Sequence, residues 1–112
     1  MMKVQNNLQN EDAVFLDAKS LVRESSAMRI LLADDDEHTR EYLKGLLVSA
    51  GHTVYEVEDG HSAVDKFADI LPDLVMIDVH IQGLTGHEAA IKIREKCGSR
   101  FVPIIFMTRN ND

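Results

Sequence analysis

The stretch ILLADDDEHTR, residues 30–40, sets an apolar run directly against three consecutive aspartates. The run before the aspartates is continuously apolar, as in a strand that is buried on both faces of a parallel sheet. Such a strand normally ends in a turn residue, but this one ends in Asp34, Asp35 and Asp36. Adjacent carboxylates repel one another, so three of them at the end of a buried strand indicate a functional role.

Length and composition restrict the classes of protein to consider. The chain has 112 residues, enough for one small domain, and its 45% hydrophobic and 28% charged residues are ordinary for a soluble globular protein. No stretch approaches the ~20 apolar residues of a membrane span, and the N-terminus lacks a signal-peptide pattern. The lone Cys97 cannot form an internal disulfide, so we expect a cytoplasmic protein. The net charge of -7 argues against nucleic-acid binding by this segment.

Predicted strands and helices alternate from residue 28 onward. Apolar runs or alternation indicate strands, and apolar residues at helical spacing indicate helices. The predicted strands are Arg29–Ala33, Thr53–Val57, Leu74–Val79 and Val102–Met107, and the predicted helices are Glu37–Ala50, His61–Ile70 and His87–Lys96. This order predicts an α/β fold with a doubly wound parallel sheet. The polar and β-branched alternation of Thr53–Val57 predicts a strand near an edge.

Residues 1–27 precede this pattern as an N-terminal extension. Residues 1–10 are polar and rich in Asn and Gln, which predicts disorder. In residues 11–25 apolar side chains recur at helical spacing, which predicts a helix that packs on the domain or on a second copy. It lacks the basic polar face of a membrane anchor.

Polar side chains lie at the carboxyl ends of three predicted strands. Asp34 and Asp35 follow the first strand, Asp78 lies near the end of the third, and Thr108 follows the fourth. In an open parallel sheet these ends meet at one edge, where ligands bind. A divalent cation relieves the repulsion between clustered carboxylates, and oxygen ligands suit Mg²⁺. Asp78 interrupts an apolar run and is therefore the best candidate for a nucleophile toward phosphorus, with Thr108 as a donor to the phosphoryl group.

The strings RILLADDDEHTR, PDLVMIDVHIQGLTG and VPIIFMT together resemble the receiver domain of two-component response regulators. The resemblance covers residues 28–112, and it implies a flavodoxin-like (CheY-like) sheet with the strand order 2-1-3-4. It implies that Asp78 is the phosphoacceptor and that Asp34 and Asp35 are the acidic pair. Asp36 matches no functional position and is expected to begin the following helix.

The resemblance also implies the remaining site residues and the partners. Mg²⁺ would be held directly by Asp35, Asp78 and the backbone carbonyl of His80, and indirectly by Asp34. Thr108 would be the switch hydroxyl. The chain would then be a signalling switch that receives its phosphoryl group from a histidine kinase or phosphotransfer protein. It would control an output domain or downstream protein, without being an enzyme toward an outside substrate.

The sequence departs from the family pattern in three places. Ile81-Gln82 replaces the usual Met-Pro, and Arg109 stands where a small residue is usual. The chain also ends before the final helix, strand and helix, which carry a lysine that pairs with the phosphoryl group. The fourth strand would then be an exposed sheet edge. Three explanations are open: the chain is a fragment, it forms a homodimer, or the predicted N-terminal helix folds back over the uncovered face.

Two other functions fit parts of the pattern. The first is a receiver-like interaction or dimerisation module that is never phosphorylated. The second is a metal-dependent phosphatase with Asp78 as the nucleophile. Such phosphatases use a second acid two residues later, and His80 occupies that position here.

Overall fold

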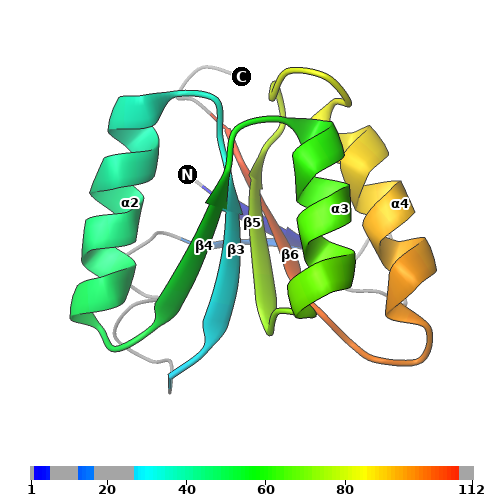
Figure 1. Cartoon of the computed structure of the whole chain (residues 1–112), viewed down its shortest axis with the longest axis horizontal. Coiled ribbons are helices and arrows are strands. Elements are labelled where there is room, and N and C mark those ends of the chain that lie inside the picture. Colours follow the sequence, from blue (N-terminus) through cyan, green and yellow to red (C-terminus); the bar gives the residue numbers. More distant parts are fainter. Residues whose placement is uncertain (1, 6–12, 17–26, 109–112) are drawn as a thin grey trace.

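The computed structural model describes residues 2–5, 13–16 and 27–108, in which six strands form one sheet (Figure 1). The elements in chain order are β1 (Met2–Gln5), β2 (Ala13–Leu16), β3 (Arg29–Ala33), α2 (Glu37–Ser49), β4 (Thr53–Val57), α3 (Gly60–Ile70), β5 (Leu74–Asp78), α4 (Gly86–Cys97) and β6 (Ile104–Met107). The strand order across the sheet is β2-β1-β6-β5-β3-β4. None of the helices in these ranges has the length and apolar character needed to cross a bilayer.

Four of the strands form the predicted parallel sheet. β3 pairs in parallel with β4 on one side and with β5 on the other, and β5 pairs in parallel with β6. In chain order these strands run 2-1-3-4 across the sheet, so the flavodoxin-like expectation is confirmed. β4 lies at the edge of the sheet, as its polar and β-branched alternation predicted.

Helices cover both faces of the parallel strands. α2 lies on one face, and α3 and α4 lie side by side on the other (Figure 1). Alternate residues of each strand face opposite sides, so Leu31 and Ala33 pack toward α3 and α4, whereas Ile30 and Leu32 pack toward α2. Two apolar cores result, one on each side of the sheet. Their packing holds the strands in place and so positions the side chains at the carboxyl ends of the strands, the rim of the sheet.

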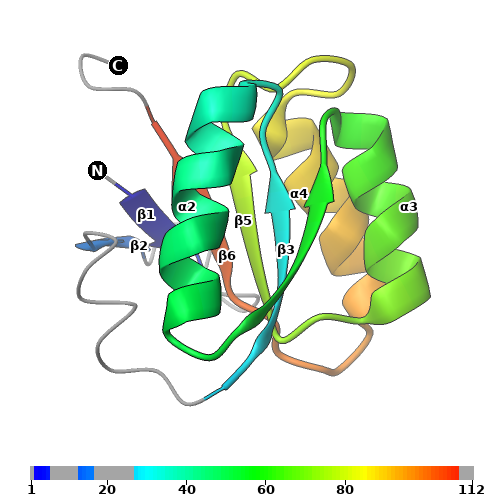
Figure 2. The same ribbon diagram turned by 60° about the vertical axis from the view of Figure 1, so that its left-hand side comes forward.

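The N-terminal segment adds two antiparallel strands beside β6 (Figure 2). β1 pairs with β6, from Met2 opposite Met107 to Gln5 opposite Ile104, and β2 pairs with β1. The disorder predicted for residues 1–10 is therefore wrong at Met2–Gln5, and the helix predicted for 11–25 is wrong at Ala13–Leu16. The rest of both predictions lies outside the described residues.

Tertiary context explains this correction. The apolar run AVFL at 13–16 suits a strand as well as one side of a helix, so periodicity alone does not decide between them. The outer edge of β6 presents a row of backbone donors and acceptors, and a strand can satisfy them whereas a helix cannot. The N-terminal segment does fold back, but as strands along the edge. The predicted homodimer stays a prediction.

Each described helix begins at a residue that caps it. The Asp36 side chain accepts a hydrogen bond from the Thr39 main-chain nitrogen at 3.0 Å, which confirms that Asp36 begins α2. Asp59 caps α3 in the same way. At α4 the caps are reciprocal, because Thr85 accepts from the Glu88 main chain and the Glu88 side chain accepts from the Thr85 main chain. These caps fix where the loops at the upper rim of the sheet end.

Candidate functional site

The pairing register of the sheet places two of the predicted acids next to each other. Ala33 of β3 pairs with Ile77 of β5, so one residue further on Asp34 lies beside Asp78. Asp34 continues the series of β3 residues that face α2, and Asp78 follows Met76 on the same side of β5. Two strands distant in sequence therefore deliver carboxylates to one side of one rim.

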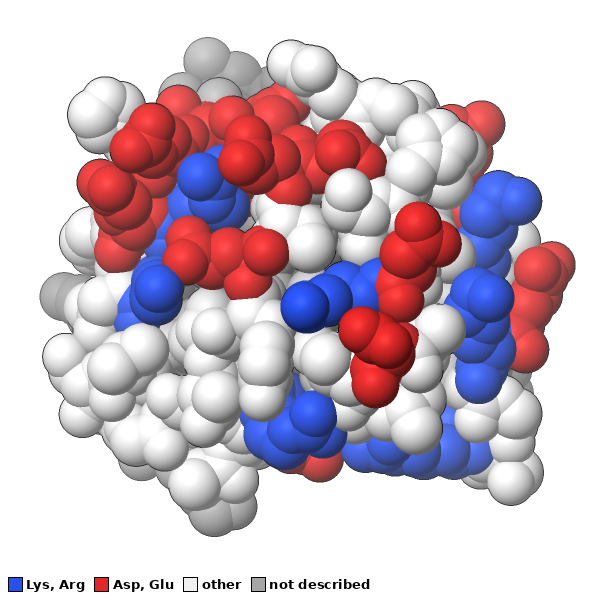
Figure 3. Space-filling view, viewed as in Figure 1, with Lys and Arg blue, Asp and Glu red and all other residues white. Residues whose placement is uncertain are grey.

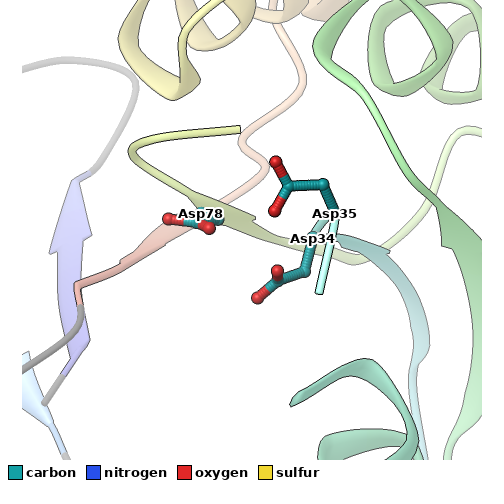
Figure 4. Close-up of side chains that lie close together, drawn as sticks. All are labelled: Asp34, Asp35 and Asp78. Carbon is teal, nitrogen blue, oxygen red and sulfur yellow. The ribbon is translucent and has the colours of Figure 1, made fainter. Parts of the chain in front are cut away.

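Asp35 completes a cluster with these two residues (Figure 4). Asp34, Asp35 and Asp78 each offer a carboxylate oxygen, and the three oxygens lie within 4.8 Å of one another. Asp34 is 1% exposed and Asp78 is 2% exposed, whereas Asp35 is half-buried. Carboxylates that lie this close together with little exposure to solvent favour a bound cation, and hard oxygen donors suit Mg²⁺.

Backbone donors orient the two buried carboxylates. The Asp36 main-chain nitrogen donates to Asp34 Oδ1 at 2.8 Å, and the His80 main-chain nitrogen donates to Asp78 Oδ1 at 3.0 Å. Each bond joins a carboxylate to the residue two positions later, which is the geometry of an Asx turn. Each carboxylate is thus fixed by the first residues of its own loop.

The other two predicted residues also lie at this rim. Thr108 directly follows Met107, and Met107 pairs with Asp78 across β5 and β6. The Thr108 side chain is half-buried. The side chain of His80 is exposed, while its main-chain nitrogen donates to the Asp78 carboxylate. The fold therefore brings all five predicted positions to one end of the sheet.

The loop that follows Asp78 is tied to α3 although it lacks the usual proline. The Gly60 main-chain nitrogen donates to the Gln82 carbonyl at 2.8 Å, and Asp59 and Gln82 form an isolated parallel bridge. Ile81 is buried and joins the core beneath α3 and α4. The Ile81-Gln82 pair therefore anchors the loop by packing and by a backbone hydrogen bond.

Acidic residues gather over the upper rim, with basic side chains among them (Figure 3). Arg40 of α2 lies 3.3 Å and Lys44 lies 2.8 Å from the carboxylate of Glu56 on β4. The hydrogen bond from Lys44, and to a lesser degree the contact with Arg40, lowers the pKa of Glu56 below its ordinary value. Glu56 is therefore ionised at neutral pH and can anchor both cations.

The cap of α3 makes the rim sensitive to acid. The Ser62 main-chain nitrogen donates to Asp59 Oδ1 at 2.8 Å, and this bond is the main reason why the pKa of Asp59 lies below its ordinary value. A carboxyl whose pKa is lowered by folding stabilises the folded state at neutral pH. That stabilisation is lost as the pH falls below the ordinary Asp value of about 3.9.

Substitutions at Asp59 should separate the cap from its titration. Asp59→Asn keeps an acceptor for Ser62 but loses the charge, so we expect a smaller loss of stability at neutral pH than in Asp59→Ala and a shallower further loss in acid. Asp59→Ala removes the acceptor and should lower the free energy of unfolding by about 1 kcal/mol. Urea unfolding at neutral and acidic pH measures both effects. Asp65→Asn, an exposed acid of α3, is the control; an acid dependence equal in Asp59→Asn and wild type would contradict the assignment.

Sequence reasoning did not single out Arg40, although it contacts the main chain of Asp34 and the side chain of Glu56. Arg40 lies one turn before Lys44 on α2, and residues four apart share a helix face. This spacing in the sequence indicates two basic side chains on one side of the helix. Their common acidic partner on β4 is set by the sheet, which sequence spacing does not reveal.

Residues 30–112 match the family model described as response regulator receiver domain. The chain belongs to the response regulator receiver domain family. The recognition made from the quoted motifs is confirmed, and the receiver domain is thereby placed among the regulatory domains of two-component signalling systems.

Curated proteins of known name are similar to this chain in sequence. The receiver domain is 32% identical over 96 residues to the sensory/regulatory protein RpfC of Xanthomonas campestris pv. campestris, covering 84% of this chain and 13% of RpfC. It is 34% identical over 86 residues to the regulatory protein VanRB of Enterococcus faecalis, covering 77% of this chain and 38% of VanRB. The chain thus spans less than half the length of these curated relatives.

Solved structures also resemble the receiver domain. The signal receiver domain of a modulated diguanylate cyclase from Desulfovibrio desulfuricans G20 matches with a TM-score of 0.67 and 31% identity, over 75% of this chain and 66% of that one. The receiver domain of a sensor histidine kinase from Pseudomonas aeruginosa PAO1 matches with a TM-score of 0.60 and 28% identity, over 62% of this chain and 57% of that one. The latter structure has a magnesium ion coordinated in its active site cleft.

Proposed function

We propose that this receiver domain is a phosphorylation-dependent signalling switch in which Asp78 accepts a phosphoryl group with Mg²⁺ bound beside it. The main support is the cluster of Asp34, Asp35 and Asp78, whose carboxylate oxygens lie within 4.8 Å of one another at the ends of two neighbouring strands. All three donors are carboxylates, which fits a hard divalent cation. The magnesium ion in the Pseudomonas aeruginosa receiver domain supports the same choice of metal.

Each residue of the site has a proposed role. Asp35, Asp78 and the main-chain carbonyl of His80 hold Mg²⁺ directly. Asp34 acts indirectly, which is supported by the hydrogen bond that its Oδ1 already accepts from Asp36. When bound, Mg²⁺ offsets the negative charge that gathers between Asp78 and the incoming phosphoryl group.

The transfer forms one bond and breaks one bond. A carboxylate oxygen of Asp78 attacks phosphorus on the phosphorylated histidine of a histidine kinase or phosphotransfer protein. As the new O–P bond forms, the N–P bond breaks, and the histidine nitrogen leaves with the electron pair. The hydroxyl of Thr108 then donates a hydrogen bond to a phosphoryl oxygen, which draws the end of β6 toward Asp78.

The readout follows from the position of Thr108. It directly follows β6, so a movement there changes the surface around the end of that strand. We propose that this surface contacts an output domain or downstream protein, and that the domain turns over no outside substrate. A compartment that keeps thiols reduced, such as the cytoplasm, suits the single Cys97.

Phosphorylation by a small donor tests the proposal. We expect the chain incubated with Mg²⁺ and acetyl phosphate to gain the mass of one phosphoryl group, measured on the intact protein. Asp78→Asn should abolish the adduct because the amide is not a nucleophile. Asp65→Asn, which removes an exposed carboxylate of α3, should leave it unchanged.

The other outcomes identify the alternative functions. Absence of an adduct in the wild type, with Mg²⁺ present, would favour an interaction module that is never phosphorylated. Rapid release of inorganic phosphate from several phosphate esters would favour a phosphatase. An adduct that persists in Asp78→Asn would mean that another residue accepts the phosphoryl group.

A further inference from the structure

Arg40 is a mostly buried cation that connects the acidic loop to two elements. Its side chain is 12% exposed, so the guanidinium needs partners. Nη1 donates to the main-chain oxygen of Asp34 at 2.8 Å, and Nε donates to Glu56 Oε1 at 3.3 Å. One planar side chain from α2 therefore holds both the end of β3 and the side of β4.

The oxygen that Arg40 holds belongs to the peptide group between Asp34 and Asp35. A peptide group is planar, so fixing its oxygen also fixes the direction in which the chain enters Asp35. The main-chain nitrogen of Asp34 is held separately by the carbonyl of Val57 at 3.2 Å. Together these bonds set the path of the loop that carries two of the three clustered carboxylates.

The way Arg40 is bound also suits a supporting role at a cation site. Its bond to Asp34 goes to the main-chain oxygen, so Arg40 does not compete with a cation for the Asp34 carboxylate. Glu56 holds the guanidinium from the far side and is itself held by Lys44. A planar fork fixed at both ends has little freedom to turn.

We propose that Arg40 is a positioning residue of the acidic site, which sets the Asp34–Asp35 peptide in the geometry that binds the divalent cation. The inference rests on the proposed function, because it assumes that the carboxylate cluster holds Mg²⁺. It predicts that loss of the Arg40 side chain weakens Mg²⁺ binding more than loss of the Lys44 side chain, which also binds Glu56.

Lys44 offers the matched control for this test. Arg40→Met and Lys44→Met remove the same charge from the same helix, and both lost cations bind Glu56. Among the residues that the structure describes, however, only Arg40 of the two donates to the Asp34 carbonyl. Calorimetric titration with Mg²⁺ gives affinity, and urea unfolding without Mg²⁺ gives stability. We expect Arg40→Met to weaken Mg²⁺ binding by about 10-fold, and Lys44→Met by no more than about 2-fold.

The rate of phosphorylation by acetyl phosphate separates positioning from a general structural role. Arg40→Met should raise the Mg²⁺ concentration that gives half the maximal rate, while the rate at saturating Mg²⁺ stays close to wild type. Arg40→Lys keeps the charge but not the planar fork, so it should restore only part of the affinity.

Two results would overturn the assignment in different ways. Equal losses of Mg²⁺ affinity in Arg40→Met and Lys44→Met would assign the effect to their shared contact with Glu56 instead of the bond to Asp34, and would leave the proposed function standing. A wild-type chain that binds no Mg²⁺ would remove both the role of Arg40 and the metal site on which it depends.

Discussion

Mg²⁺ is expected to raise the thermal unfolding midpoint of the wild-type chain and to leave that of Asp35→Asn almost unchanged. The carboxylates of Asp34, Asp35 and Asp78 lie within 4.8 Å of one another, and a cation that binds only the folded state stabilises it by mass action. At a concentration 100 times the dissociation constant this amounts to about 2.7 kcal/mol. Asp35→Asn removes a proposed direct ligand, so little of that gain should remain.

The order of stability should reverse when Mg²⁺ is removed. Two unit charges about 4 Å apart repel by roughly 4 kcal/mol at the effective dielectric near a protein surface, and water reduces this further at the half-buried Asp35. Without Mg²⁺, Asp35→Asn should therefore be at least as stable as the wild type, whereas with Mg²⁺ it should be less stable. Thermal melts in Mg²⁺ and in EDTA measure both. Equal Mg²⁺ shifts in the two proteins would contradict the role of Asp35.

Gly86→Ala is expected to lower the free energy of unfolding by about 1–3 kcal/mol, as overpacking does elsewhere. A Cβ at this position would lie 2.6 Å from the main-chain oxygen of Asp78 and 2.8 Å from the Cα of Val79. Both are backbone atoms beside the proposed phosphoacceptor, so they can yield only by moving the loop. Phosphorylation at Asp78 should therefore slow as well.

Gly45→Ala is the matched control in the same chain. Among the residues that the structure describes, a Cβ on Gly45 of α2 would meet no atom within 4 Å beyond the backbone of its own helix turn, so alanine should stabilise the helix by about 0.5–1 kcal/mol. Urea unfolding of the two variants should give changes of opposite sign. A stabilising Gly86→Ala would mean that the start of α4 lies further from the end of β5 in solution than in the structure.

Local pattern was sufficient for the parallel part of the fold. β3 and β4 have the predicted bounds, because continuous burial and polar alternation are properties of a few adjacent residues. β5 ends one residue earlier than predicted, at Asp78, and β6 begins after Pro103, which has no N–H for the ladder. The N-terminal prediction failed because the partner of that segment, β6, lies about a hundred residues away, as the pairing of Met2 with Met107 shows.

The residues of the site likewise fall into those that the sequence predicted and those that only the structure revealed. The sequence identified Asp34, Asp35 and Asp78 as strand-end carboxylates, because charges that end buried strands are visible in the order of residues alone. It did not reveal the role of Arg40 or the close approach of Gly86 to Asp78. Both depend on contacts across elements.

By itself, the sequence determined the family, the parallel strand order through that resemblance, and the acids at the rim. Only the tertiary structure decided that the first residues extend the sheet, that Asp34 and Asp78 are neighbours in register, and that Arg40 holds the acidic loop. The physical reason is range. Hydrophobic period and charge are carried by neighbouring residues, whereas edge pairing and hydrogen bonds between elements exist only once distant segments have been brought together.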